Sequence, residues 1–375
     1  MIPPAFPLSR VREFNFADHH VAPGFQGTEV VQVARALIGL HSARLPTPYM
    51  SLASRLPSFL PQMLRERQYE TRTLVKLRCM RRTLHTVPLD LAPIVHRATL
   101  DLRMMDLRAR LRGLGATSKA LERTAMRIRE IMDTGAQPAS TIVLRTVERQ
   151  RGTAGDVAAV LLARLSLKYL WEMGELTYHN RASHWAREER WFESTSVAYP
   201  SLRLNELDEV EARRKLVSAY IDRFGPVTER DIVWWSGLRV VDVRTAIRDL
   251  ADELAVVSVT GLHDSCYMSL RSLARLDTFK PPARQWVRFL AYEDPSLKGY
   301  FESRARYLSP DHVALAFNSI GEVLPCVMIG GELVGRWSWD STARRVRWAP
   351  FVPRSKLAPA IERERVHFEE MLRSW

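Results

Sequence analysis

The sequence has few cysteines, and they are not arranged for crosslinking or metal binding. Its 375 residues include only Cys79, Cys266 and Cys326, which lie far apart and form no CxxC or HxxxC spacing. This pattern argues against a disulfide scaffold and against a structural zinc site. We therefore predict buried reduced thiols, no metal site and no cofactor.

Long apolar runs are also absent. No stretch approaches the roughly 18 consecutive apolar residues of a membrane-spanning helix, and the N-terminal residues MIPPAFPLSRVREF carry early prolines instead of the apolar core of a signal peptide. We expect a cytoplasmic protein that does not interact with membranes. With 46% hydrophobic residues the chain can bury substantial cores, and its length predicts two or three domains.

Acidic residues are outnumbered by basic ones. The chain has 55 lysines and arginines against 42 acidic residues, which gives a formal net charge of +13. Such a balance suits a polyanionic partner such as nucleic acid. The excess is mainly arginine, whose forked guanidinium matches phosphate geometry better than lysine does.

The most informative stretch covers residues 37–59, LIGLHSARLPTPYMSLASRLPSF. Helical spacing of the apolar residues from Val30 predicts a helix that ends near His41, and the prolines that follow predict a break before a short returning helix over 49–56. His41 and Ser42 would then lie at a helix end, where polar side chains often perform chemistry. The alternative is that His41 is a partly buried capping residue that bonds a last-turn carbonyl.

The rest of the N-terminal part is predicted as a mixture of strands and helices. We expect residues 1–27 to be a loop with an exposed His19-His20 pair, 74–80 and 82–87 to be strands, and 100–132 to form two helices. His85 lies in the second strand, where a histidine is ordinarily a hydrogen-bonded core residue.

Two later regions predict winged helices, in which a helix-turn-helix unit is followed by a β-hairpin. In the first, helices over 140–149 and 153–165 are followed by a glycine turn and a strand over 175–178. In the second, helices over 211–224, 229–236 and 240–254 are followed by a strand over 255–261. The helix over 240–254 exposes charges of both signs, which suits a scaffold better than a dedicated reader of the major groove.

The C-terminal region predicts a small antiparallel sheet. A linker over 278–283 precedes a strand over 287–290, a hairpin over 323–339 that turns at Gly330-Gly331, a third strand over 344–348 and a final helix over 358–372. The predicted fold is α+β and mainly helical, with tandem winged-helix units and a C-terminal domain that contains antiparallel β-structure. The predicted domains are 1–137, which carries the His41 stretch, 138–205, 206–278 and 279–375.

Five stretches together resemble the winged-helix DNA glycosylases of the AlkZ and YcaQ type. They are LIGLHSARLPTPYMSL, RRTLHTVP, FGPVTERDIVWWSGL, YEDPSLKGY and FNSIGEVLPCVMIGGELVGRW. In that family a Gln-Φ-Gln or Gln-Φ-Asp motif, where Φ is apolar, precedes a proline-containing loop. The aligned positions here are His41, Ser42 and Ala43, so the first polar position is kept as a histidine and the second is lost.

The resemblance implies hydrolysis of the N-glycosidic bond of N-alkylated purines in duplex DNA. The implied substrates are N7-alkylguanine-type adducts, bulky or crosslinked, removed in base excision repair or in self-resistance to a genotoxic natural product. A neutral His41 would activate the water, with Ser42 as orienting residue and His85, Arg82 and Arg44 as supporting residues. Because no lysine lies at the motif, we expect a monofunctional enzyme without a lyase step.

The arginines that we expect to contact DNA lie elsewhere in the chain. They are Arg244, Arg248, Arg336 and Arg345. Nothing in the sequence demands a dimer, so we expect a monomer associated with the nucleoid. The alternative function is a winged-helix protein that binds DNA without catalysis, as a transcriptional regulator or a damage binder, and the loss of the second polar motif position favours it.

Overall fold

The computed structural model describes residues 3–150, 156–282, 286–352 and 358–375. Within these residues helices predominate, and the strands form three sheets of three strands and one sheet of four. The predicted α+β class with mainly helical content is therefore confirmed. No helix of the described part is long and apolar enough to cross a membrane.

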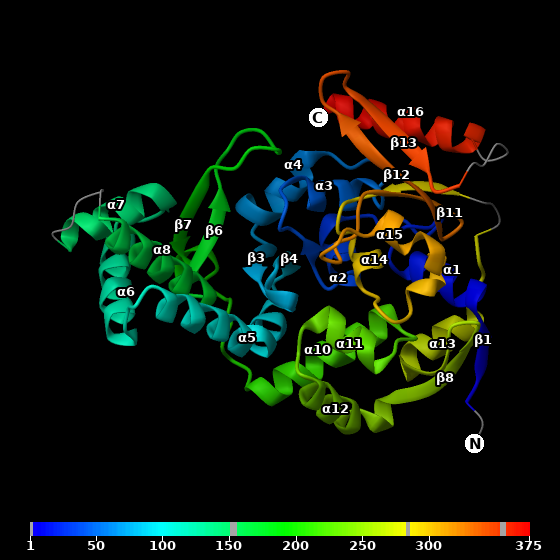
Figure 1. The fold of residues 1–375 in the computed structure, drawn as a ribbon, viewed down its shortest axis with the longest axis horizontal. Helices are drawn as coiled ribbons and strands as arrows, with labels where there is room; N and C mark the ends of the chain where they lie inside the picture. Colours follow the sequence, from blue (N-terminus) through cyan, green and yellow to red (C-terminus); the bar gives the residue numbers. More distant parts are fainter. Residues whose placement is uncertain (1–2, 151–155, 283–285, 353–357) are drawn as a thin grey trace.

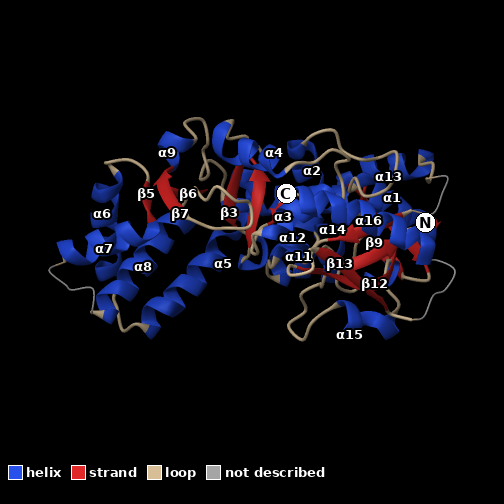
Figure 2. Ribbon diagram, turned by 90° about the horizontal axis from the view of Figure 1, so that it is seen from above, coloured by secondary structure: helices blue, strands red, loops and turns tan. Residues whose placement is uncertain are grey.

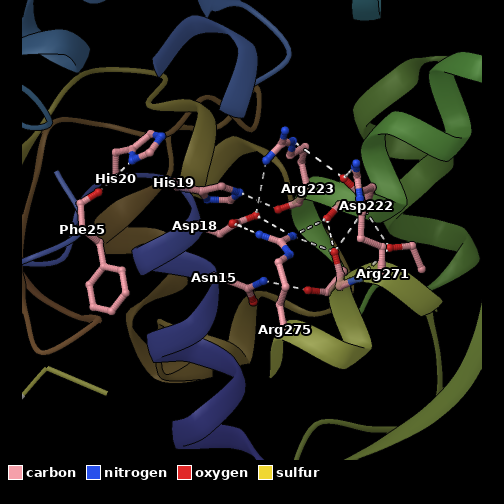
Figure 3. Close-up of polar contacts among 12 residues, drawn as sticks. Asn15, Asp18, His19, His20, Phe25, Asp222, Arg223, Arg271 and Arg275 are labelled. Carbon is pink, nitrogen blue, oxygen red and sulfur yellow. Dashed lines mark hydrogen bonds and ion pairs between the residues drawn. The ribbon is translucent and has the colours of Figure 1, made fainter. Parts of the chain in front are cut away.

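The first residues are not the loop that we predicted. They form β1 (Ala5–Pro7), which pairs in parallel with β8 (Leu254–Thr260), and α1 (Leu8–Asp18), whose apolar face is buried. Figure 3 shows how polar contacts attach this helix to residues far along the chain: the Asp18 carboxylate pairs with Arg275, and Asn15 Nδ2 donates to the carbonyl of Gly225 over 2.7 Å. His19, predicted to be exposed, is fully buried.

The segment with the His41 stretch forms a three-stranded sheet surrounded by short helices. Its elements are α2 (Val30–Ala36), β2 (Leu40–His41), α3 (Pro46–Ala53), α4 (Pro61–Arg65), η1 (Glu66–Glu70), β3 (Leu74–Arg78), η2 (Met80–Arg82) and β4 (Leu84–Pro88). The strand order is β2-β4-β3, and both pairings are antiparallel. Strands are found within both predicted ranges, 74–80 and 82–87, but Met80 and Arg82 belong to η2, so the first strand ends earlier and the second begins later than predicted.

The helix that leads to the motif is shorter than predicted. It ends at Ala36, because Ile38 and Gly39 adopt positive φ values of 52° and 106° and turn the chain into β2. Glycine is required at the second position, since a Cβ there would lie 2.6 Å from Val87 Cγ1. His41 is therefore a strand residue and not a helix-end residue.

The next region contains two long helices and the elements of the first predicted winged helix. They are α5 (Ala92–Gly113), α6 (Ser118–Met132), β5 (Gln137–Pro138), α7 (Ala139–Arg149), α8 (Val157–Glu172), β6 (Leu176–Asn180), β7 (Arg190–Ser194) and α9 (Thr195–Ala198). The helix predicted over 153–165 begins at Val157 in the structure, and residues 153–155 lie outside the described part. Strands β6 and β7 form the antiparallel hairpin that follows the helices.

The region of the second predicted winged helix has the expected order. Its elements are α10 (Glu209–Phe224), α11 (Glu229–Ser236), α12 (Val240–Asp249), η3 (Ala251–Glu253), β8, β9 (His263–Ser269) and α13 (Leu270–Thr278). Thr228 caps α11, and Gly237 ends it in the left-handed conformation at φ 75°. The helix predicted over 240–254 is shorter, because η3 intervenes and β8 already begins at Leu254.

The C-terminal region forms the predicted antiparallel sheet. Its elements are β10 (Val287–Leu290), α14 (Pro295–Lys298), η4 (Arg304–Arg306), η5 (Pro310–His312), α15 (Val313–Ala316), β11 (Cys326–Ile329), β12 (Glu332–Asp340), β13 (Arg345–Pro350) and α16 (Ala358–Ser374). The β11–β12 hairpin turns at Gly330-Gly331 as predicted. Phe368 of α16 stacks on Phe289 of β10 at 5.4 Å between ring centroids, so the final helix covers the sheet.

The elements are arranged around the segment with the His41 stretch. Figures 1 and 2 both place α6, α7 and α8 with β6 and β7 at one end of the molecule and the sheet of β12 and β13 toward the other. The largest hydrophobic core contains residues of α1, the β3–β4 sheet, α10–α12 and the C-terminal region. The division into four domains and the tandem winged-helix assignment stay predictions.

Candidate active site

The sheet brings the two histidines of the predicted site together. His41 on β2 lies directly opposite His85 on β4, and their ring centroids are 5.3 Å apart in an edge-to-face arrangement. Only 3% of His41 and 7% of His85 are exposed. The two residues are therefore neighbours in a buried site.

A lysine and a glutamate from the C-terminal region complete this cluster. Lys298, the last residue of α14, places Nζ 3.3 Å from His41 Nε2 and contacts Glu293 Oε2. Glu293 Oε2 is also 3.7 Å from His41 Nε2, and its Oε1 accepts a hydrogen bond of 2.7 Å from the amide of Val323. Only 1% of Glu293 is exposed, so the ion pair is shielded from solvent.

A small cavity lies beside these side chains. It is lined by His41, His85 and Lys298 together with Arg81, Trp235 and Pro295, and its volume is about 10 Å³. A cavity needs about 10–15 Å³ to hold one water molecule. The cavity is therefore close in size to one water molecule and has no room for a base.

Larger hollows lie elsewhere. One of about 730 Å³ is bordered by Glu175 and Arg203, and one of about 840 Å³ by Trp171 and Arg164. Neither is lined by a residue of the predicted site. The motif therefore does not open into a preformed base-binding pocket.

Burial keeps both histidines uncharged. The pKa of His41 is held well below its usual value, chiefly because the ring is removed from water and then because of the positive charges of Lys298, Arg81 and Arg44. Burial, followed by the charge of Lys298, lowers the pKa of His85 to about 3. Both rings are neutral at physiological pH.

Lys298 is the group of the cluster that titrates near neutrality. Burial and then the charge of Arg81 lower its pKa to about 7, and Glu322 opposes the shift. The carboxylate of Glu293 also favours the charged ammonium. Charged and neutral forms of Lys298 are therefore both accessible under physiological conditions.

The hydrogen bonds define the tautomers of the two rings. A charged Lys298 only donates, so His41 Nε2 accepts and the ring proton lies on Nδ1, which has no hydrogen-bond partner among the described residues. His85 Nδ1 lies 3.3 Å from the carbonyl of Thr83, which only accepts, so the lone pair of His85 is on Nε2. When Lys298 is neutral, His41 Nε2 can keep a proton and Nδ1 becomes the free acceptor.

Ser42 does not face the cavity. Adjacent strand residues point to opposite faces, and the Ser42 hydroxyl donates to the carbonyl of Leu40 over 2.9 Å and lies 2.9 Å from Thr86 Oγ1. Its position is a buried hydrogen-bonding one. The geometry gives no support to the orienting role that we predicted for this residue.

The predicted supporting arginines are separated. The Arg44 guanidinium lies 3.9 Å from the centre of the Tyr292 ring and donates to the Tyr292 hydroxyl over 3.0 Å. Arg82 is exposed and does not line the cavity, whereas its neighbour Arg81 does. Arg81 and Arg82 form a tight turn with positive φ values of 51° and 59°, so their side chains point in different directions. Arg81 therefore lies beside the cavity, where we expected Arg82.

The four arginines expected to contact DNA are exposed but not clustered. Arg244 and Arg248 lie on α12, and Arg336 and Arg345 lie on β12 and β13. Figure 1 shows α12 below and the C-terminal strands above the elements of the motif. Arg244 is already paired with Glu229 at 3.0 Å. Their role in DNA contact stays a prediction.

Sequence reasoning missed Lys298, Glu293 and Arg81. The stretch YEDPSLKGY contains a usable signal, because a glutamate and a lysine five positions apart flank the capped helix start Asp294-Pro295. No local pattern, however, joins it to His41 across 257 residues. Groups of three or more histidine, cysteine or acidic side chains that could hold a metal ion are absent from the described residues.

Comparison with known proteins gives two findings. A sequence model for the family described as DNA glycosylase AlkZ-like matches residues 34–371. The solved structure of Streptomyces sahachiroi DNA glycosylase AlkZ superposes with a TM-score of 0.78 at 19% sequence identity, over 98% of this chain and 97% of that chain. A search of curated proteins found no match. At this identity the structural likeness shows the fold.

Proposed function

The chain belongs to the AlkZ-like family of DNA glycosylases, and we propose that it hydrolyses the N-glycosidic bond of N-alkylated purines in duplex DNA with His41 as the water-activating residue. The proposed substrates are N7-alkylguanine-type adducts that are bulky or crosslinked. The proposed setting is repair of alkylation damage, or self-resistance to a genotoxic natural product, at the nucleoid in the cytoplasm.

The reaction needs little acid catalysis from the protein. Breaking the bond between C1′ and the base nitrogen creates an oxocarbenium-like sugar to which water adds. A guanine alkylated at N7 is already cationic, so it leaves without being protonated. The remaining work is to place the water and to stabilise positive charge on the sugar.

One observation supports the proposal: an uncharged His41 ring lines a cavity of about 10 Å³, close to the volume that one water molecule needs. Burial lowers the pKa of His41, so the ring does not add charge to a site where a cation must form. Its Nδ1 has no partner in the described residues, and a buried polar atom of this kind ordinarily bonds a water. Removal of a proton from that water by a neutral imidazole fits the usual strength of histidine as a base.

The size of the cavity favours attack on a base that stays stacked. Pockets that enclose a ligand of base size and larger measure roughly 300 Å³ or more, against about 10 Å³ at His41. Extrusion of the target nucleotide into this cavity is therefore not part of the proposal. Bulky adducts, which resist extrusion, are compatible with a reaction at the mouth of the cavity.

The presence of Lys298 near His41 means that the expected absence of a lyase step needs a different reason. That expectation depended on the absence of a lysine at the motif, and the structure places Nζ of Lys298 3.3 Å from His41 Nε2. We still propose a monofunctional enzyme, because this amine is engaged by both His41 and Glu293. Borohydride during the reaction would trap a Schiff base as a covalent protein–DNA complex, and we expect none.

A second candidate function is DNA binding without catalysis. Ala43 supplies no polar group at the second motif position, and His41 is 3% exposed. Both observations suit a damage binder or a regulator that keeps the fold and has lost hydrolysis.

Excision of a defined adduct separates the two candidates. The protein is incubated with duplex DNA that carries 7-methylguanine or a bulkier N7 adduct, and abasic sites are then revealed by alkali. We expect strand breaks at the adduct and none in unmodified duplex. Tight binding to one operator sequence without any excision would establish the regulator instead.

A further inference from the structure

A stack of aromatic and arginine side chains lies beside the His41 cavity. Trp234 packs against Phe301 with ring centroids 4.7 Å apart, and the Arg81 guanidinium lies 3.7 Å from the centre of the Trp234 ring. The Arg304 guanidinium lies 5.2 Å from Trp234 and 3.9 Å from the ring of Phe317. We call Arg81, Trp234 and Arg304 the arginine stack.

The two guanidiniums of the arginine stack have no close ion-pair partner. Within the described residues, neither Arg81 nor Arg304 has a carboxylate within 4.0 Å, and the acidic groups that raise their pKa values, Glu322 for Arg81 and Asp231 for Arg304, act from farther away. Burial, and then the charge of Arg304, lowers the pKa of Arg81 to about 10. By contrast, the buried guanidinium of Arg55 is paired with Asp294 at 2.7 Å. Two unpaired cations close together are costly unless an anion joins them.

Donor groups of the stack are left without acceptors. Arg81 Nη1, Arg304 Nη2 and Trp234 Nε1 are buried, and none has a hydrogen-bond partner within the part of the chain that the structure describes. Buried donors are ordinarily satisfied. Three unsatisfied donors on contacting side chains, two of them on guanidiniums, are of the kind that binds the oxygen atoms of a phosphate group.

Backbone contacts hold the stack in position. Gly237, which ends α11 in the left-handed conformation, lies so close to Arg81 that a Cβ would be 3.1 Å from the Arg81 backbone nitrogen. A Cβ on Gly321 would lie 3.3 Å from the Trp234 ring. The stretches WWSGL and FNSIGEV therefore pack closely against Arg81 and Trp234, with no space for a side chain at either glycine without a shift.

An anion here would also remove an electrostatic conflict at the proposed site. Positive charge must develop on the sugar, yet Arg81 and Lys298 both line the cavity beside His41. Glu293 pairs with Lys298, and Glu322, which accepts from Tyr292 and from Asn318, acts on Lys298 and Arg81 from beyond 4.0 Å. A phosphate bound to Arg81 and Arg304 would add negative charge next to the forming cation.

We propose that the arginine stack binds one phosphodiester group of the damaged strand, next to the nucleotide that is cleaved. Arg81 lines both the stack and the His41 cavity, so the phosphate would place the adjoining deoxyribose at the cavity mouth. Trp234 has Phe301 and Arg81 on its ring, so it supports the arginines and is not a platform for a base. The inference rests on the proposed function for the location of the sugar.

The test combines variants with phosphate substitution in the DNA. Affinity is measured for a short duplex containing a 2′-fluoroarabino 7-methylguanine, which resists excision, with each phosphate near the lesion replaced in turn by a neutral methylphosphonate. Arg81→Gln and Arg304→Gln remove single guanidiniums. Arg230→Gln is the matched control, because Arg230 lies 5.8 Å from the Phe301 ring but is exposed and paired with Glu302 at 3.0 Å.

We expect each stack variant to weaken binding by about tenfold, as for a charge-assisted hydrogen bond. The slope of log affinity against log salt should fall by about 0.9 for each phosphate that the protein no longer neutralises. For the wild-type protein, a methylphosphonate at one position should weaken binding by the same amount. In the stack variants, a methylphosphonate at that position should cause no further loss of affinity. Arg230→Gln should match the wild type.

Three outcomes are decisive. Equal affinity and salt slope in folded Arg81→Gln and Arg304→Gln would overturn the phosphate site and leave a purely structural stack. Excision by the wild type together with that result would refute this inference alone. A position-specific phosphate effect without any excision would support the site while the proposed function fails. Thermal melting of each variant shows that it is folded.

Discussion

The protonation state of Lys298 should control the rate of excision. When its ammonium is charged, it donates to His41 Nε2, places the ring proton on Nδ1 and adds a positive charge near the sugar. When the amine is neutral, His41 can keep a proton on Nε2 and offer Nδ1 to the water. Excision should therefore be faster with neutral Lys298 and should rise with pH.

The size of this effect can be estimated from the site. Two unit charges roughly 6 Å apart interact by about 3 kcal/mol at an effective dielectric constant of about 20, and Glu293 offsets part of this. We expect the neutral form to react about 10–100 times faster than the charged form. With a pKa of about 7, the neutral fraction is about 0.1 at pH 6 and about 0.9 at pH 8.

The assay is single-turnover excision of 7-methylguanine from duplex DNA between pH 5.5 and pH 9, roughly the range over which a group with a pKa near 7 titrates. Spontaneous base loss is subtracted at each pH, and alkali is added only after quenching at a common pH. The histidines should not contribute, because the pKa of His85 is lowered to about 3 and that of His41 is also far below its usual value.

Two variants isolate Lys298 as the source. Lys298→Met combined with Glu293→Gln removes the titrating amine and its buried partner together, and it should give a flat profile. Glu293→Gln alone removes a charge that favours the ammonium, so the step should move to lower pH. A wild-type rate that does not change between about pH 6 and pH 8, or the same step in the double variant, would refute the reasoning.

Three further variants, two of them with a matched control, test the structure around the site. Asp294→Asn leaves the guanidinium of Arg55 buried without its partner, so the free energy of unfolding should fall by about 3–5 kcal/mol in denaturant titration; Asp90→Asn, in an exposed pair, should cost less than about 1 kcal/mol. Gly39→Ala, at φ 106°, should cost about 2 kcal/mol or more, whereas Gly113→Ala, in α5 with no neighbour within 4 Å, should not destabilise the protein and should add up to about 1 kcal/mol to its stability. The excision rate of Ser42→Ala should be within about threefold of the wild-type rate, since the Ser42 hydroxyl faces away from the cavity. A decrease of about hundredfold would show that Ser42 takes part in catalysis.

Local sequence patterns were sufficient for most of the strands and helices. Gly330-Gly331 between apolar strands predicted the C-terminal hairpin, and the helix predicted over 229–236 coincides with α11, which is capped by Thr228 and Gly237. The helix before His41 was extended too far, because an isoleucine at positive φ has no sequence signature. The N-terminal helix was missed, because it is stabilised by contacts with residues such as Arg275.

The site could be predicted only in part. His41 and His85 were named from two short stretches, and strand pairing explains why they meet. Lys298, Glu293 and Arg81 were not found, because their proximity is produced by packing of the C-terminal region against the motif sheet. The choice of Arg82 over Arg81 shows the limit of local reasoning, since a tight turn decides which of two adjacent side chains faces the cavity.

The central claim is that the neutral ring of His41 activates the water that cleaves the glycosidic bond. Single-turnover excision of 7-methylguanine by His41→Ala at saturating protein measures this directly. We predict a rate at least about hundredfold below wild type, the usual contribution of a positioned base, with affinity for the damaged duplex unchanged within about twofold. Excision by His41→Ala at the wild-type rate would contradict the account.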